Sequence, residues 1–361
     1  MSTMPSNSAT AHEVRRVLRA FAQRPGLRSE SSCLRMQAAD PLTTPDGLAV
    51  RTADWAILIA ELEKVMTAQN GEPTRALVLG GGGLVGIAWQ TGLLTGLREA
   101  GLDLADAEVI LGTSAGSVVG ALAASRTDVA AVQARMAAVA ELVGAEQLAA
   151  GFQNFMTAVW QADLETDREQ GLRSIAKAAE GTKTIDERAY LGLYEAFAGL
   201  PWPSAYHCTA VDAETGELVV WGPESGVPLQ NAVASSCAVP MIYPTVTLKG
   251  RRYIDGGLAN HLNAAAAPRT DRMIAISSVP LGVDVPGMPP AMGRNADREL
   301  AAVGADRWLA TVEPLGSSEE GRVVNAMDPQ AASEAYALGL RQAEVELDRL
   351  TAVWTGQRPP V

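Results

Sequence analysis

Short uncharged runs of apolar residues alternate along the chain with longer stretches in which apolar residues recur at helical spacing. Residues 76–79 and 109–111 are two such runs, and each leads into a glycine-rich turn and then into a predicted helix. Units that alternate strand and helix in this way are typical of a parallel sheet covered by helices. The pattern therefore predicts an α/β fold.

The second half of the chain continues this sheet. Two β-rich runs flank a predicted turn at residues 214–216, and a predicted hairpin turns near Lys249 and Gly250. Residues 272–279 form another buried apolar run, which predicts a further strand. The hairpin ends at Asp255, so this carboxylate is expected at the end of a strand.

Helical spacing marks three further regions. Residues 127–200 are mostly helical in pattern, and we interpret them as an insertion that covers the site. Residues 229–240 predict a short helix that is ended by Pro240. A long final helix is expected after Asp328, with Pro329 in its first turn. Its inner stripe is predicted to consist of Tyr336, Leu340, Ala343, Leu347, Leu350 and Trp354.

The N-terminal part of the chain differs from the rest. Its first 40 residues contain Ser, Thr, Pro and Arg with few apolar residues, a composition that fits a mobile extension, a linker or a transit peptide. An amphipathic helix is predicted next, with Trp55 on its apolar face. We therefore divide the chain into an N-terminal extension, 1–70, and a domain, 71–361, with its motifs in 75–263 and a C-terminal strand and helix in 271–355.

Composition excludes some classes of partner. The chain has 361 residues, of which 47% are hydrophobic, enough to form a large folded core. Its formal net charge of −12 argues against nucleic-acid binding, because phosphate contacts supply most of that affinity. The same charge argues against purely electrostatic docking to anionic lipids, whereas apolar insertion into a membrane stays open.

Cysteine usage and the first residues bear on the compartment. Cys33, Cys208 and Cys237 are odd in number and widely spaced, so neither a disulfide framework nor a CxxC metal site is expected. The chain does not begin with a basic stretch followed by an apolar core, so no secretory signal is predicted. We expect a cytoplasmic protein, and peripheral association with a membrane is left open.

Three interpretations compete for the glycines at 80–83 and 86. Residues 76–97 carry no charge, and about 20 apolar residues span a bilayer, but seven glycines argue against a membrane helix. Gly81, Gly83 and Gly86 also satisfy the G-x-G-x-x-G pattern of dinucleotide-binding loops. In the third interpretation, the glycine amides form an oxyanion hole for acyl chemistry.

Gly112, Ser114 and Gly116 match the pattern G-x-S-x-G between a predicted strand and a predicted helix. In a nucleophile elbow, small residues on both sides of the serine allow a strained turn that exposes its hydroxyl group. This turn weakens the dinucleotide interpretation, because the second strand of such a fold ends near an acid that holds the ribose. Ser114 is therefore the candidate nucleophile.

A nucleophilic serine needs a base, and the chain contains three histidines, His12, His207 and His261. His12 lies in the N-terminal extension, and His207 alternates within a strand pattern that indicates a structural role. His261 follows Asp255 by six residues, whereas the partners in serine-hydrolase triads lie on separate loops. The remaining candidate is the carboxylate of Asp255 acting directly on the serine.

The glycine loop, the serine elbow and an Asp-Gly-Gly motif, in this order, resemble the patatin-like phospholipase family. In that family a glycine loop forms the oxyanion hole, G-x-S-x-G supplies the nucleophile, and D-G-[AG] supplies the aspartate of a Ser-Asp dyad. The resemblance extends over residues 75–263 and includes Pro240, Pro244 and Asn260 in the stretch that leads into and past the aspartate.

The resemblance implies a three-layer α/β/α fold with a mainly parallel sheet. It makes Ser114 the nucleophile and Asp255 the base. The implied oxyanion-hole residues are Gly81, Gly82 and Gly83, and the supporting glycines are Gly86, Gly112, Gly116, Gly256 and Gly257. We also expect the Ala115 amide to be an oxyanion donor. Val85 departs from the family, which usually has Arg or Lys there, and this favours a neutral lipid or a simple ester as substrate.

The expected function is hydrolysis of acyl esters, as by a lipase or a phospholipase A, with a lipid or ester substrate and no metal or other cofactor. Membrane contact during this reaction is left open. Transfer of the acyl group to an acceptor other than water and a non-catalytic lipid-binding role remain alternatives, and a nucleotide-binding oxidoreductase is a more distant one. The sequence predicts no nucleic-acid partner and leaves the oligomeric state open.

Overall fold

The computed structural model describes the domain that carries the motifs, over residues 74–127, 142–162, 165, 167–282, 290–305, 307–315 and 326–357. The predicted N-terminal extension with its amphipathic helix, and most of the helix predicted after residue 127, lie outside the described residues. No helix in the described ranges is long and apolar enough to cross a membrane.

The described residues form one sheet with a parallel centre. Strands β8, β7, β1, β2 and β3 lie side by side in this order and are parallel, whereas β4, β5 and β6 pair in antiparallel fashion. The strands are β1 (Arg75–Leu79), β2 (Val109–Thr113), β3 (Tyr206–Asp212), β4 (Leu218–Trp221), β5 (Val246–Leu248), β6 (Arg251–Asp255), β7 (Arg272–Ile276) and β8 (Trp308–Val312). The predicted parallel sheet is confirmed.

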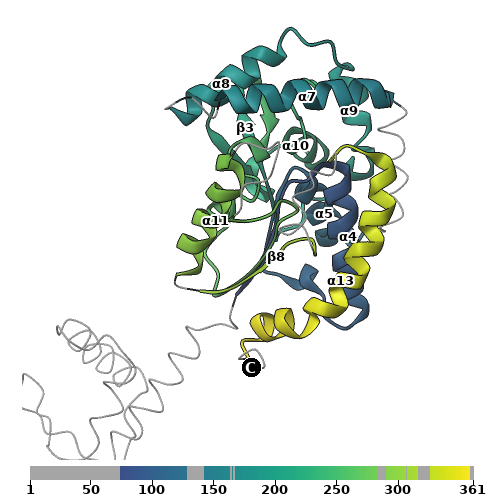
Figure 1. The fold of residues 1–361 in the computed structure, drawn as a ribbon, viewed down its shortest axis with the longest axis vertical. Helices are drawn as coiled ribbons and strands as arrows, with labels where there is room; N and C mark the ends of the chain where they lie inside the picture. Colours follow the sequence, from purple (N-terminus) through teal and green to yellow (C-terminus); the bar gives the residue numbers. More distant parts are fainter. Residues whose placement is uncertain are drawn as a thin grey trace, which may run out of the picture. The chain divides into compact units, whose positions relative to one another are not determined.

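Helices cover both faces of this sheet (Figure 1). The helices are α4 (Gly83–Glu99), α5 (Ala115–Ala124), α7 (Ala145–Ala162), α8 (Arg168–Ala179), α9 (Glu187–Gly192), α10 (Leu229–Ser236), α11 (Pro290–Gly304) and α13 (Pro329–Thr355). Leu77 and Leu79 of β1 face a core shared with α4, α5 and α13, whereas Ala76 and Val78 face a second core that includes α11. The three-layer α/β/α fold is confirmed.

The register of β3 brings the ends of two strands together. Thr113 of β2 lies opposite Thr209, and Asp255 of β6 lies opposite Ala210, the next residue of β3. Strand β4 pairs with residues 208–211 and so overlaps both pairings, which places β4 on the other edge of β3. Strands β2 and β6 therefore share one edge of β3, and their carboxyl ends meet there.

The β5–β6 hairpin forms as the sequence predicts. Its two turn residues, Lys249 and Gly250, have φ angles of 51° and 77°. Positive φ at both central positions is typical of a type I′ turn, whose twist matches that of the two strands. The turn fixes which side chains of β6 face inward, and it places Asp255 at the far end of the strand.

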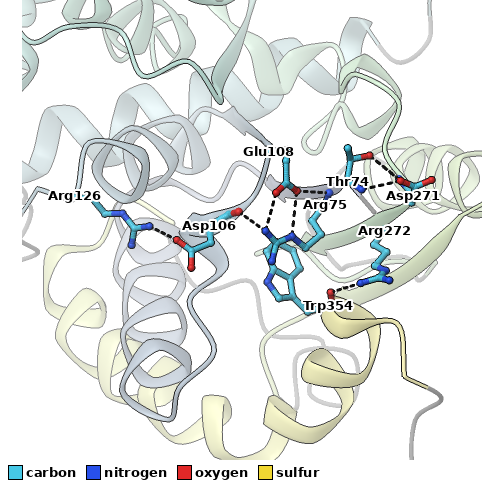
Figure 2. Close-up of polar contacts among 8 residues, drawn as sticks. All are labelled: Thr74, Arg75, Asp106, Glu108, Arg126, Asp271, Arg272 and Trp354. Carbon is cyan, nitrogen blue, oxygen red and sulfur yellow. Dashed lines mark hydrogen bonds and ion pairs between the residues drawn. The ribbon is translucent and has the colours of Figure 1, made fainter. Parts of the chain in front are cut away.

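Polar contacts fix the amino end of β1 (Figure 2). The Arg75 guanidinium forms an ion pair with Glu108, with Nη2 and Oε1 at 2.8 Å, and its carbon lies 5.0 Å from the ring centroid of Trp354. Thr74 donates to Asp271 from its amide, at 2.8 Å, and from its hydroxyl, at 3.0 Å. These contacts join the start of β1 to the segments that lead into β2 and β7 and to α13.

Helices α4 and α13 pack at very short range. A Cβ atom at Gly92 of α4 would lie 2.2 Å from the Tyr336 carbonyl oxygen, and one at Gly339 of α13 would lie 2.2 Å from the Trp89 carbonyl oxygen. Both distances are far below van der Waals contact with a backbone oxygen. The two helices would have to move apart to remove such a clash. Glycine at these positions therefore sets the distance between the helices.

We expect Gly92→Ala to lower the free energy of unfolding by about 2 kcal/mol or more, because overpacking outweighs the gain of about 1 kcal/mol from helix propensity. Urea denaturation measures this loss. Gly192→Ala, in α9, is the matched control, because in the described part of the chain no atom beyond its neighbours and its own helix lies within 4 Å of the added Cβ. Equal unfolding free energies for the two variants would contradict the close packing.

Candidate active site

Ser114 lies in a sharp turn between β2 and α5. Its φ and ψ angles are 51° and −117°, a conformation that residues other than glycine rarely adopt. A Cβ atom at Gly112 would lie 2.4 Å from Ser117 Cα, and one at Gly116 would lie 2.1 Å from the Leu79 carbonyl oxygen. The turn therefore needs glycine two residues before and two residues after Ser114, which explains the spacing of the motif.

Ser114 and Asp255 are in direct contact at the point where β2 and β6 end. Ser114 Oγ donates to Asp255 Oδ2 at 2.6 Å, and the Gly257 amide donates to Asp255 Oδ1 at 2.7 Å. Burial raises the pKa of the Asp255 carboxyl group to about 7, although the hydrogen bonds from Ser114 and Gly257 lower it. A carboxyl group with a pKa near neutrality is suited to accept and return a proton.

The main chain of Ser114 is also held on both sides. Its amide donates to Ser236 Oγ at 3.0 Å, and its carbonyl oxygen accepts from Ser117 Oγ at 2.7 Å and Cys237 Sγ at 3.2 Å. Burial raises the pKa of the Cys237 thiol well above its usual range, so this group stays protonated and can donate. The sequence does not indicate Ser236 or Cys237, which lie more than one hundred residues away.

The glycine loop lies beside the candidate nucleophile. A Cβ atom at Gly81 would lie 3.5 Å from Ser114 Cβ. The Gly80 carbonyl oxygen accepts from the Gly116 amide at 3.0 Å and from Gln90 Nε2 at 2.8 Å, so the loop and the serine elbow are joined directly. The structure therefore brings all three sequence motifs to one place.

The amides of this loop differ in their partners. The Gly81 amide donates to the His261 carbonyl oxygen at 2.7 Å, which differs from the expectation that it faces the substrate. Within the described residues, the amides of Gly82, Gly83 and Ala115 have no acceptor. The last two open helices α4 and α5, where the first amides have no partner within the helix. These three donors are available to a ligand.

The two histidines in the described residues, His207 and His261, form hydrogen bonds with groups other than Ser114. His261 is buried, with Nε2 2.8 Å from Ser277 Oγ, and its carbonyl oxygen holds the glycine loop. His207 is half-buried, and its Nδ1 lies 3.3 Å from the Ala205 carbonyl oxygen. His12 lies outside the described residues. In the described part of the chain, the group bonded to Ser114 Oγ is the carboxylate of Asp255.

Helices α7 and α8 belong to the region predicted to cover the site. They share a hydrophobic cluster with Val211 of β3, Ile254 of β6 and Met241, and they lie beyond one end of the sheet (Figure 1). A Cβ atom at Gly151 of α7 would lie 2.8 Å from the Met241 carbonyl oxygen, so the contact is close. The strand that carries Asp255 therefore packs directly beneath these helices.

The family model described as patatin-like phospholipase matches residues 77–268. This range is more than half of the chain, and it includes the glycine loop, the serine elbow and Asp255. The chain belongs to the patatin-like phospholipase family. The predicted family is therefore confirmed.

Solved structures and curated proteins were compared as well. VipD from Legionella pneumophila is similar with 14% sequence identity and a TM-score of 0.37, over 77% of this chain and 67% of VipD. The type III effector protein ExoU is similar with 18% identity and a TM-score of 0.35, over 77% of this chain and 53% of ExoU. This chain thus spans about half the length of ExoU. No curated protein matches the chain.

Proposed function

We propose that this patatin-like protein hydrolyses acyl esters of lipids through a Ser114–Asp255 dyad. The observation that carries the proposal is the 2.6 Å hydrogen bond from Ser114 Oγ to Asp255 Oδ2. Both residues are nearly buried, with 8% and 4% of their surface exposed, so the bond is shielded from water. A shielded serine with an adjacent proton acceptor is the arrangement of an activated nucleophile.

Each step of the reaction uses these two side chains. Asp255 accepts the Ser114 proton while Oγ attacks the ester carbonyl carbon, and the carbonyl oxygen becomes an oxyanion. The C–O bond to the alcohol then breaks, and the alcohol leaves with the proton held by Asp255. Water attacks the acyl-enzyme with Asp255 again as base, and the acid is released as Ser114 regains its proton.

Main-chain amides stabilise the oxyanion in this proposal. The predicted donors were Gly81, Gly82, Gly83 and Ala115, and the bond from the Gly81 amide to His261 leaves Gly82, Gly83 and Ala115 for this role. Donors that are fixed before the reaction stabilise the transition state without reorganisation, and one such donor contributes about 3 kcal/mol. Because Val85 is uncharged, no cation at this position of the loop assists them.

The apolar surroundings of the dyad support a lipid substrate. Helices α7 and α8 cover β6 with apolar side chains. We propose that the acyl chain of the substrate binds beside these helices. Release of p-nitrophenol from short- and medium-chain esters, and of fatty acid from lipid vesicles, tests the proposal. A purified protein that releases no acyl group from any of these substrates would contradict it.

The activity is expected to rise with pH through about pH 7. Only ionised Asp255 accepts the Ser114 proton, and its pKa is about 7, so kcat/KM increases about tenfold per pH unit well below this value and levels off above it. Stopped assays, read at one common pH, avoid the titration of p-nitrophenol. An acid limb centred near pH 4 would show that a carboxyl group with an ordinary pKa is the base.

A further inference from the structure

A buried amide lies directly behind the dyad. Asn263 Nδ2 donates to the Gly256 carbonyl oxygen at 3.0 Å, to Thr113 Oγ1 at 3.2 Å and to Thr209 Oγ1 at 3.3 Å. At most 2% of the surface of Thr113, Thr209 and Asn263 is exposed. One side chain thus contacts β2, β3 and the turn that follows β6.

The three acceptors share the two N–H groups of Asn263 Nδ2, so one N–H lies between two of these acceptors. The two threonine oxygens lie 2.8 Å apart, and Thr113 Oγ1 is 3.3 Å from the Leu262 carbonyl oxygen. Asn263 supplies only N–H donors to this network, so Thr209 can donate to Thr113, and Thr113 can donate to Leu262. Such a buried network is rigid, because a shift of any member leaves a polar group without its partner.

The network touches the residue before the nucleophile and the residue after the base. Thr113 precedes Ser114, and Gly256 follows Asp255. We infer that Asn263 is a positioning residue that sets the distance between Ser114 and Asp255 by holding the two flanking residues to one amide group. This inference rests on the proposed function of the dyad.

A physical reason exists for such a tether. An ionised carboxylate in a buried site is drawn towards water, so the turn after Asp255 must be held if the carboxylate is to stay beside Ser114. The turn is already pressed on β3, because a Cβ atom at Gly256 would lie 2.4 Å from Thr209 Oγ1. Asn263 itself has a φ of 52°, a conformation that asparagine tolerates better than most residues.

The first test replaces Asn263 with glycine, which keeps the left-handed backbone and removes the amide. We expect the rate of p-nitrophenyl ester hydrolysis and the rate of Ser114 labelling by a fluorophosphonate to fall about tenfold to a hundredfold, because a misplacement of about 1 Å can cost that much. Lys249→Gly is the matched control, since Lys249 has a similar left-handed φ of 51° in the exposed turn of the β5–β6 hairpin. It should keep at least half of the rate.

The second test separates positioning from a general loss of structure. If Asn263 acts through Asp255, then Asn263→Gly should slow labelling in the wild-type background and leave it unchanged in an Asp255→Asn background. The same factor of loss in both backgrounds would overturn the inference, and so would a wild-type rate for Asn263→Gly.

A second pair of variants keeps the inference testable if Asn263→Gly does not fold. Thr209→Val keeps the shape of the side chain and removes one hydroxyl group of the network, whereas Thr209→Ser keeps the hydroxyl group. We expect several-fold slower labelling for Thr209→Val only, and equal rates for the two would overturn the inference. Full activity of Ser114→Ala, by contrast, would reject the proposed function itself.

Discussion

Ser114→Ala is expected to lose ester hydrolysis by about a thousandfold or more, because the oxygen that forms the acyl-enzyme is gone and only the bound substrate and the oxyanion donors remain. The fold should persist. The variant loses one hydrogen bond, to Asp255, and keeps the main-chain bonds to Ser236, Ser117 and Cys237. Hydrolysis of p-nitrophenyl esters and fluorophosphonate labelling measure the loss.

Ser125→Ala is a suitable control for this experiment. Ser125 caps the other end of α5, and its hydroxyl oxygen is buried without a hydrogen-bond partner among the described residues. Removal of this hydroxyl group should leave both the rate and the labelling at wild-type levels. Labelling that persists in Ser114→Ala would show that another residue is the nucleophile.

Asp255→Asn is expected to abolish most of the activity and, at the same time, to stabilise the protein at alkaline pH. The loss of the proton acceptor should lower kcat by about a thousandfold, in line with the effect of disabling a catalytic aspartate elsewhere. The amide oxygen can still accept from Gly257, so the turn should be kept. Activity near the wild-type level would show that Asp255 is not the base.

The stabilising effect follows from the raised pKa of Asp255. The folded protein binds this proton more tightly than the unfolded chain, with pKa values of about 7 and 3.8, so the stability contributed by the group is complete below about pH 4. It is lost as the pH rises towards 7 and above. At about 1.4 kcal/mol per pKa unit, the loss approaches about 4 kcal/mol at pH 8.

Asparagine does not titrate, so the variant should escape this loss. Urea denaturation of wild type and Asp255→Asn at pH 5 and pH 8 checks the expectation, since all other titrating groups cancel in the difference. We expect the variant to gain a few kcal/mol relative to wild type between these two pH values. A difference in unfolding free energy that does not change with pH would contradict the burial of an ionised carboxylate.

Local sequence signals predicted much of the sheet. Strands β1, β2 and β7 are apolar runs that are buried on both faces, and the hairpin at Lys249 and Gly250 is marked by its turn. Helix α13 begins as predicted, since Asp328 Oδ1 accepts from the Gln330 amide. Of its predicted stripe, Ala343, Leu350 and Trp354 are buried in the core.

Strand β8 and helix α11 were not predicted as separate elements. Within the described residues, β8 pairs with β7 alone; its first residue, Trp308, is 42% exposed, and Thr311 interrupts its apolar run. Helix α11 begins at Pro290 and contains glycine at position 293, which obscures its helical spacing. At the edge of a sheet, half of the side chains face water, and the apolar signal is correspondingly weak.

The motifs of the site were visible in the sequence, but their supports were not. The resemblance to a family selected Ser114 and Asp255, and the structure brings them to 2.6 Å. Ser236, which accepts from the Ser114 amide, lies 122 residues from Ser114, and Asn263, which donates to Thr113, lies 150 residues from Thr113. Such contacts depend on the assembled sheet, so no local pattern marks them. The hydrogen bond from the Gly81 amide to the His261 carbonyl oxygen was missed for the same reason.

The close packing of α13 on α4 also has a consequence for biosynthesis. Helix α4 carries the glycine loop at its amino end, and the Val85 amide donates to the Ala326 carbonyl oxygen, just before α13 begins. A ribosome completes Ser114 and Asp255 long before it completes α13, and during that interval α4 lacks the helix that holds it. The nascent chain therefore carries Ser114 and Asp255 before α4 is held in place, and we expect the proposed hydrolytic activity to develop only when α13 has docked.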